Sequence, residues 1–585
     1  MTIDDLITKG FLPEELPPVF TSEDLSKVLR EIIPQIDILD PLIGKKRLPS
    51  KALHFSIPKV GGYRRNLSVP NPLFYIRLSK TISDNWAEIY KHTEKSTLSM
   101  SRLKLGSSRT IAKPIFDELI QERIIRSAGS RHLLKVDISR FYNSIYTHSI
   151  PWALHTKPIA KIHRKRTPHF GNALDEDCRK LQDGQTIGIP VGPDTSRVIS
   201  EIILSSIDQI LIKKLPSFKG VRIIDDYYLY FKNLGDAELA RAIVHQTLRE
   251  YELELNPNKD TIISIPEVLE SLWYKDLKAV RFSPDATKQR KELIGFFDKA
   301  FYHAKQQPDD AVLSYAISKI RATIFNEKNL VILQSLLLNS IVHESRTIHL
   351  LSEILISYHE KKHKFDLKGI KFGLEQFIDF HCEMNNEFEI SWALWTMKSL
   401  KLKLNSKIAG KLSKINNSII SLVCLDMKRA KLIPKGLNTA LWKSVLNKEN
   451  LYSEHWLLAY EAKRNGWLKT ADNYLDDDPF FSILKKKKVK FYKENKTINT
   501  TKVKVASNAP SVAEYKSDED AFDEMMKKIS KEQHSPQKNP SIFDLAELSK
   551  IDVGLPDFFK SENLEPSKKT ELAKKTTKGH SEHSD

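Results

Sequence analysis

The chain has 585 residues, of which 41% are hydrophobic and 28% charged, and its formal net charge is +18 at pH 7. This length allows several domains with at least one full core, and the positive balance favours a polyanionic partner such as nucleic acid. The three cysteines lack CxxC spacing, which excludes a disulfide framework, and no signal peptide or long apolar span is visible, so we expect a cytoplasmic protein without membrane segments.

A β-hairpin is predicted in residues 51–80. Two strand-like runs in LHFSIPKVGGYRRNLSVPNP are separated by Gly61 and Gly62, which suit a tight turn. The spacing of apolar residues then predicts a helix over 111–128.

Two short apolar runs that carry acids follow. RHLLKVDI, at 131–138, has strand character and carries Asp137 next to its end, and VRIIDDYYLYF, at 221–231, predicts two strands with Asp225 and Asp226 at the bend. Acids in such surroundings need a partner that offsets their desolvation, and a divalent cation is one such partner. Local amides or an arginine could fill the same role.

A Gly-Pro turn lies between the two acidic segments. GIPVGP, at 188–193, contains Gly188, Pro190 and Gly192 and leads into an apolar-periodic helix, within a segment that spans 185–211. Glycine allows a nucleotide or template base to approach the backbone closely, and the start of a helix favours phosphate. A helix over 235–251 and a strand-turn-strand over 253–265 follow.

The second half of the chain has a different pattern. Residues 291–470 predict successive helical hairpins, in which we expect the tryptophans to belong to the core. After about residue 494 the composition becomes rich in Lys, Ser, Thr and Asn, which predicts a mostly disordered basic and polar tail containing an apolar segment at 541–559.

The order of these motifs resembles the palm of reverse transcriptases. Asp137 with FYNSIY is similar to their motif A, GIPVGP to motif B, and IIDDYYLYF to motif C. YRRNLSVPNP resembles the finger strand that binds triphosphate, and LELNPNKDT resembles motif D. The resemblance covers about residues 50–280.

The resemblance implies roles for individual residues. Asp137 and Asp225 would be the main ligands of two Mg²⁺ ions (or Mn²⁺), with the backbone carbonyl of Ile138 and the weaker acid Asp226 assisting. The residues implied for nucleotide binding are Arg65, Tyr142, Pro190, Gly192 and Lys259. Arg65 would contact the triphosphate, a role that Arg64 could take instead. Tyr142 would exclude a ribose 2′-hydroxyl, and Lys259 would protonate pyrophosphate.

Two positions depart from the family pattern. Ile223 stands where an aromatic residue usually precedes the first acid of motif C, and Val191 stands where motif B commonly has Gln. Because Val cannot hydrogen-bond a sugar or a base, template-independent or protein-primed synthesis stays open as a second hypothesis.

The predicted fold is α+β: a right-hand polymerase palm and fingers, with an antiparallel sheet and helices, followed by an all-α, helical-repeat-like domain. The expected boundaries are an N-terminal extension with fingers at 1–130, a palm at 131–290, a helical domain at 291–494 and the tail at 495–585.

This layout resembles the abortive-infection and defence-associated reverse transcriptases of bacteria. The resemblance implies an RNA-directed DNA polymerase in antiphage defence. Its expected partners are dNTPs, an RNA template or noncoding RNA, a DNA product, and a second defence protein or further copies of the chain. The same residues are also compatible with a non-catalytic nucleic-acid-binding subunit or with an RNA-dependent RNA polymerase.

Overall fold

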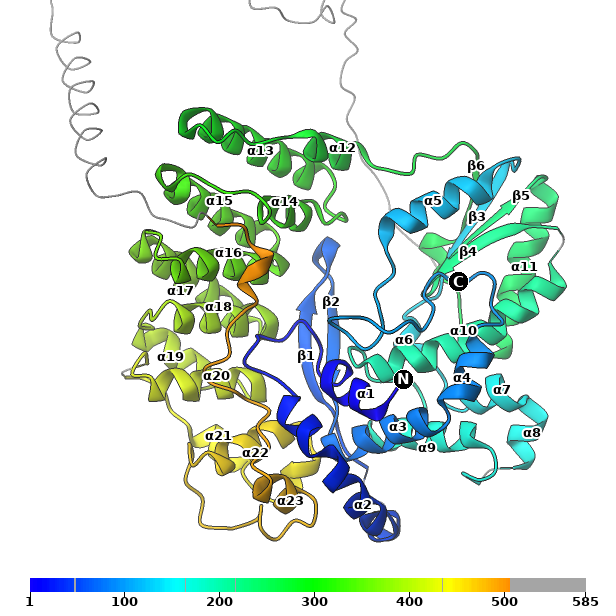
Figure 1. Cartoon of the computed structure of the whole chain (residues 1–585), viewed down its shortest axis with the longest axis horizontal. Helices are drawn as coiled ribbons and strands as arrows, with labels where there is room; N and C mark the ends of the chain where they lie inside the picture. The colour runs from blue at the N-terminus through cyan, green and yellow to red at the C-terminus, as the bar shows by residue number, and fades with distance from the viewer. Residues whose placement is uncertain (47–48, 164, 216, 434, 506–585) are drawn as a thin grey trace, which may run out of the picture. The chain divides into compact units, whose positions relative to one another are not determined.

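Two antiparallel β-sheets organise the first half of the chain (Figure 1). The computed structural model describes residues 1–46, 49–163, 165–215, 217–433 and 435–505, all of which lie in the unit Met1–Ala509. The strands are β1 (Leu53–Pro58), β2 (Arg64–Val69), β3 (His132–Asp137), β4 (Lys219–Ile223), β5 (Asp226–Phe231) and β6 (Thr261–Ser264).

Strands β1 and β2 form the predicted hairpin. They pair antiparallel from Leu53 opposite Val69 to Pro58 opposite Arg64. The turn contains a short 3-10 helix, η1 (Val60–Gly62), and both of its glycines have positive φ, 71° for Gly61 and 75° for Gly62. The Gly-Gly pair therefore serves the turn as expected, because residues with a Cβ rarely adopt this conformation.

The other four strands form one sheet in the order β4-β5-β3-β6. Along β3 and β5, alternate residues enter two separate apolar clusters. Leu134 and Leu229 belong to the main core, whereas Leu133 and Tyr230 pack with Leu119 on the other face. A sheet buried on both faces needs apolar residues at successive positions, which explains why LLKV has a single polar residue, Lys135, and YYLYF has no charged one.

Helices surround this sheet. Helix α11 contacts β3 and β5, and α5 contacts β4 and β5. The helices of the first half are α1 (Ile3–Gly10), α2 (Glu23–Lys46), α3 (Pro72–Asp84), α4 (Trp86–Thr93), α5 (Phe116–Ser127), α6 (Phe141–Ser144), α7 (Ser149–His155), α8 (Lys157–Ile162), α9 (Phe170–Lys180), α10 (Asp194–Lys214) and α11 (Leu234–Glu250).

The second half of the described chain is helical. Its helices are α12 (Leu272–Ala279), α13 (Ala286–Gln306), α14 (Val312–Ile320), α15 (Leu330–His343), α16 (Ile348–Glu360), α17 (Leu367–Glu383), α18 (Glu387–Ser399), α19 (Ser406–Leu412), α20 (Ser418–Arg429), α21 (Ala440–Ser444), α22 (Trp456–Arg464) and α23 (Phe481–Lys486). Short 3-10 helices complete the chain: η2 (Pro257–Lys259), η3 (Glu327–Asn329), η4 (Ser345–Thr347), η5 (Glu449–Tyr452) and η6 (Thr500–Lys502).

These helices pack as successive antiparallel pairs (Figure 1). Helices α14, α16, α18, α20 and α22 contact one another in that order, and α13, α15 and α17 each pack on the next helix of this row. Trp395, Trp442 and Trp456 are fully buried between the helices, as expected for core residues. In the described part of the chain, no helix has the length and apolar composition that crossing a membrane requires.

Two segments differ from their predictions. The first arm of the predicted strand-turn-strand at 253–265 is only an isolated bridge between Leu255 and Ile138, because Pro257 starts a 3-10 turn and only Thr261–Ser264 continues the sheet. Packing also extends beyond residue 494, since Lys496 donates to Glu23 and Val503 is buried. The apolar segment at 541–559 and most of the predicted tail lie outside the described residues.

Candidate active site

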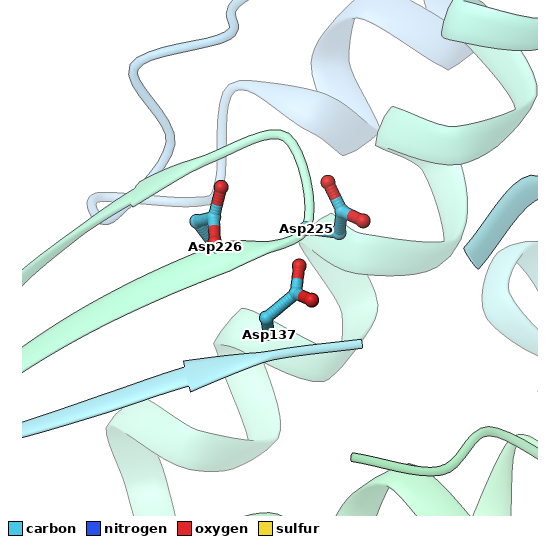
Figure 2. Close-up of side chains that lie close together, drawn as sticks. All are labelled: Asp137, Asp225 and Asp226. Carbon is cyan, nitrogen blue, oxygen red and sulfur yellow. The ribbon is translucent and has the colours of Figure 1, made fainter. Parts of the chain in front are cut away.

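Three carboxylates meet where β3 ends and the β4–β5 turn begins. Asp137 is the last residue of β3, and its partner in the register is Asp226, the first residue of β5. Asp225 precedes Asp226 in the turn. One carboxylate oxygen from each acid lies within 4.8 Å of the others, and Figure 2 shows the three side chains gathered around one small space. The acids singled out in the sequence are therefore neighbours in the fold.

This arrangement fits a divalent cation. Carboxylate oxygens are the hard ligands that Mg²⁺ and Mn²⁺ prefer, and three of them provide the negative charge that such an ion neutralises. Within the described ranges, no other group of three His, Cys, Asp or Glu side chains is placed to hold a metal. Ile138, the neighbour of Asp137, is buried in its bridge with Leu255.

Burial and mutual repulsion both disfavour the charged forms of the clustered acids. Burial, followed by the charges of Asp137 and Asp226, raises the pKa of Asp225 to about 7. Burial and the charge of Asp137 also raise the pKa of Asp226. Below about pH 7, therefore, Asp225 is largely protonated in the metal-free cluster, and a bound cation would displace that proton.

Two lysines lie near the acids, and one of them also lies near Arg65. Lys259 Nζ is 3.2 Å from Asp137 Oδ2, and this pairing outweighs burial and raises the pKa of the lysine. Lys59, in the β1–β2 turn, interacts electrostatically with Asp137, with Asp225 and with Arg65; burial and the neighbouring cations lower its pKa. Cations facing acids across a small space suit a triphosphate carrying a divalent ion.

Lys59 is absent from the residues predicted from the sequence, although a signal was available. It stands directly before the Val60–Gly62 turn, so it projects from the same hairpin as Arg65. Arg64, the other arginine considered for the triphosphate, is bound elsewhere: its Nη1 donates to Glu389 Oε1 at 2.8 Å and its Nη2 to Glu389 Oε2 at 2.9 Å. Of the two arginines, only Arg64 forms the ion pair with Glu389, so Arg65 is the one considered for the triphosphate.

Two hydrogen bonds hold the turn that carries Asp225. Ile224 has a φ of 53°, which is unfavourable for a β-branched residue. Its backbone N–H donates to Ser101 Oγ at 2.8 Å, and its carbonyl accepts from Arg222 Nη1 at 2.8 Å. These two bonds fix both polar groups of the strained residue and thereby the direction of the neighbouring acid.

Arg222 belongs to a fully buried ionic network. Its guanidinium donates to Glu201 Oε1 at 2.9 Å and to Asp208 Oδ2 at 2.8 Å, and Tyr227 Oη donates to Asp208 Oδ1 at 2.9 Å. The network connects α10 to the two strands that flank the acidic turn. An arginine within the apolar run VRII, and two acids seven residues apart on one predicted helix, were the sequence signals for it.

Tyr142 and the Gly-Pro turn lie together. Ile189 N donates to Tyr142 O at 2.9 Å. Tyr142 is in turn close enough to Asp225 for the carboxylate charge to contribute, after burial, to its raised pKa. The hydrogen bond between Ile189 and Tyr142 joins the segment after Asp137 to GIPVGP.

The two predicted residues of the Gly-Pro turn have different surroundings. Pro190 lines a cavity of about 490 Å³, together with Asn143 and Ser68. Gly192, with a φ of 117°, faces Pro13 instead, and a Cβ there would lie 2.8 Å from Pro13 Cγ. Val191 is half-buried against the core, and its carbonyl accepts from Ser68 N at 2.8 Å.

A four-stranded antiparallel sheet that ends in three clustered acids, with a hairpin beside it, is a right-hand polymerase palm with fingers. The family described as "Reverse transcriptase (RNA-dependent DNA polymerase)" matches residues 57–296. Residues 57–296 are therefore similar to a reverse transcriptase domain, and the predicted palm-and-fingers fold is confirmed. No curated protein sequence matches the chain.

Several solved structures are similar to the chain. Telomerase from Candida albicans, in complex with the TWJ fragment of telomeric RNA, has 12% identity and a TM-score of 0.27 over 65% of this chain and 64% of its own. Apo telomerase from Candida tropicalis has 12% identity and a TM-score of 0.28 over 66% of both chains. The match thus spans slightly less than two thirds of each telomerase chain.

Divalent cations are expected to raise the melting temperature more at about pH 8 than at about pH 6. Because the pKa of Asp225 is raised from 3.8 to about 7, the metal-free protein loses stability as the pH rises through this interval. At pH 8 the Asp225 carboxylate is already ionised, so a cation neutralises its charge without first displacing a proton. Scanning calorimetry with and without Mn²⁺ checks this. Asp225→Asn should remove most of the difference, and an equal rise at both pH values would contradict the expectation.

Arg222→Met should destabilise the protein by about 3–5 kcal/mol, because Glu201 and Asp208 would be left buried without their countercharge. The measurement is the fall in melting temperature. Arg102→Met is the matched control, since its pair with Glu94 is exposed and should contribute at most about 1 kcal/mol. Similar effects of the two substitutions would show that the network is not an important source of stability.

Proposed function

We propose that the chain is an RNA-directed DNA polymerase that transfers nucleotides by a two-metal mechanism. The observation that carries the proposal is the cluster of three carboxylates beside Lys59 and Lys259 in a reverse transcriptase domain. No other described part of the chain combines a metal-binding set of acids with adjacent cations. The raised pKa of Asp225 agrees with a site that needs a cation for full ionisation.

In this mechanism each residue has a defined task. Asp137, Asp225 and Asp226 would hold Mg²⁺ or Mn²⁺, which when bound activates the 3′-hydroxyl and stabilises charge on the leaving pyrophosphate. Lys59 and Arg65 bind the triphosphate and align it for in-line attack. Lys259, paired with Asp137 in the metal-free site, is placed to deliver a proton to the leaving group.

The proposal includes a biological setting. The palm is followed by paired helices, as in the bacterial defence-associated enzymes that the sequence resembles, and we propose a role in antiphage defence in the cytoplasm. The net charge of +18 supports a nucleic-acid partner, either an RNA template or a noncoding RNA, along with the DNA product. A second defence protein or further copies of the chain complete the proposed partners. We also propose a division into an N-terminal extension with fingers at 1–130, a palm at 131–290, a helical domain at 291–494 and a tail whose first residues pack on the folded unit.

Asp225→Asn should reduce DNA synthesis by roughly 10³-fold, because it removes several kcal/mol of charge stabilisation provided through the metal. The assay supplies Mg²⁺, dNTPs and the nucleic acid that co-purifies with the protein. Asp476→Asn, which alters an exposed acid paired with Lys485 in the helical half, is the control and should retain full activity. Unchanged synthesis by the Asp225 variant would remove the assignment.

A second candidate is template-independent or protein-primed DNA synthesis. Val191 favours it, because this side chain packs against the core and offers no hydrogen bond where motif B commonly has Gln. Sequencing the product separates the two: a template-complementary sequence supports copying, whereas a homopolymer or random product supports the rival. DNA covalently attached to a tyrosine would indicate protein priming. If assembly and defence persist without the acids, the chain is a non-catalytic binding subunit.

Tyr142→Ala should increase the use of ribonucleotides relative to deoxyribonucleotides by roughly 10–200-fold, the range expected when one steric contact is removed from a pocket. The reason is that Tyr142 is close enough to Asp225 for the carboxylate charge to act on it, which places the tyrosine near the proposed position of the sugar. The ratio of kcat/KM for the two nucleotides measures the effect. An unchanged ratio in which ribonucleotides are already preferred would identify an RNA-dependent RNA polymerase.

A further inference from the structure

The β1–β2 hairpin carries two of the three cations of the proposed nucleotide site, and it is bonded to the helical half of the chain. Lys59 lies in its turn and Arg65 on its second strand. Strand β1 packs along α18, and the bonds between the two halves are spread along the whole hairpin. Near its base, Asn417 Nδ2 donates to the carbonyl of His54 at 3.2 Å.

The central bond is the ion pair between Arg64 and Glu389. Both terminal nitrogens of the guanidinium donate to the carboxylate, at 2.8 and 2.9 Å, while its Nη2 also donates to the Ser56 carbonyl at 3.0 Å. The Glu389 side chain is 0% exposed, and it accepts a further bond from Ser345 Oγ at 2.9 Å. A two-pronged pair of this kind fixes both distance and orientation.

The neighbouring residues extend the connection. Ser56 N donates to Glu387 Oε2 at 3.2 Å, and Glu387 lies with Glu389 in the first turn of α18. At the tip, Gly61 N donates to the carbonyl of Pro308 at 3.1 Å. A Cβ on Gly61 would lie 2.4 Å from Asp309 Oδ1, so the turn is in close contact with the α13–α14 connection.

Arg64 and Arg65 are adjacent in β2, so their side chains leave opposite faces of the strand. The face with Arg64 meets α18. Arg65 acts on Lys59, which in turn interacts electrostatically with Asp137 and Asp225. One arginine therefore connects the hairpin to the helical half, and the next one belongs to the proposed nucleotide site.

We propose that Glu389 is a positioning residue for the incoming nucleotide: by holding Arg64, it keeps the β1–β2 hairpin where Lys59 and Arg65 reach the triphosphate. The kinetic part of this inference rests on the proposed polymerase function. Moving the hairpin away would leave the Glu389 carboxylate buried without its countercharge, which is strongly unfavourable. The helical half thus sets nucleotide affinity without touching the nucleotide.

The test compares Glu389→Gln with the wild-type full-length chain. The expected result is an increase of about tenfold in KM for dNTPs with kcat changed by less than about twofold, since the catalytic acids are untouched. Hydrogen–deuterium exchange should become faster in residues 53–69. Arg429→Gln is the matched control, because its pair with Glu494 is exposed and no described contact links it to the hairpin; it should change neither quantity.

A double variant identifies the route of the effect. If Glu389 acts through Arg64, then Arg64→Gln and the Arg64→Gln/Glu389→Gln pair should raise KM to the same extent as Glu389→Gln alone. Additive effects, unchanged KM and exchange, or a fall in kcat with unchanged KM would each overturn the proposal. If Glu389→Gln fails to fold, Arg64→Lys, which keeps the charge but cannot form the two-pronged pair, should give a smaller increase in both hairpin exchange and KM.

The two proposals fail in different ways. If the wild-type protein makes no DNA, the polymerase assignment is lost, whereas the exchange measurement still decides whether Glu389 anchors the hairpin. If the wild type is active but Glu389→Gln leaves hairpin exchange unchanged, the positioning role is lost and the polymerase assignment stands.

Discussion

The repulsion among Asp137, Asp225 and Asp226 is the constraint on which the rest of the structure depends. Three carboxylates within 4.8 Å of one another would separate if the backbone allowed it. The antiparallel register fixes Asp137 opposite Asp226, and Ser101 and Arg222 fix the strained Ile224 beside Asp225. The fold thus holds together charges that Lys259 relieves in part, and that a bound metal ion or a proton on Asp225 relieves further.

The two halves of the chain contribute to the site through different kinds of interaction. The sheet and α10 hold the acids through the buried network of Arg222, which cannot rearrange without leaving two carboxylates buried and unpaired. The helical half acts on the site indirectly, because Glu389 holds the hairpin that carries Lys59 and Arg65. The acids and the two hairpin cations, Lys59 and Arg65, therefore sit on separate supports, and their alignment depends on the packing between α18 and β1.

Local patterns were sufficient for much of this structure. The apolar runs that end in Asp137 and surround Asp225, and the Gly61-Gly62 turn, predict their strands because both faces of the sheet are buried and the turn requires positive φ. The partners of Arg222 could have been inferred, since a charge in a buried run needs a counterion. The bond from Arg64 to Glu389 could not have been inferred, because 325 residues separate the two. The sequence Arg64-Arg65 also does not indicate which arginine forms an ion pair. The first strand of the strand-turn-strand predicted over 253–265 is missing because Pro257 begins a 3-10 turn.

The close contact at the tip of the hairpin has a consequence for how this protein can vary. Gly61 leaves no room for a larger residue against Asp309, and its N–H is taken up by Pro308, which lies far along the chain in the helical half. An insertion in the β1–β2 turn, or a change in the α13–α14 connection, would break the fit unless the other segment altered with it. Among relatives of this chain, these two distant loops should therefore have evolved as a matched pair.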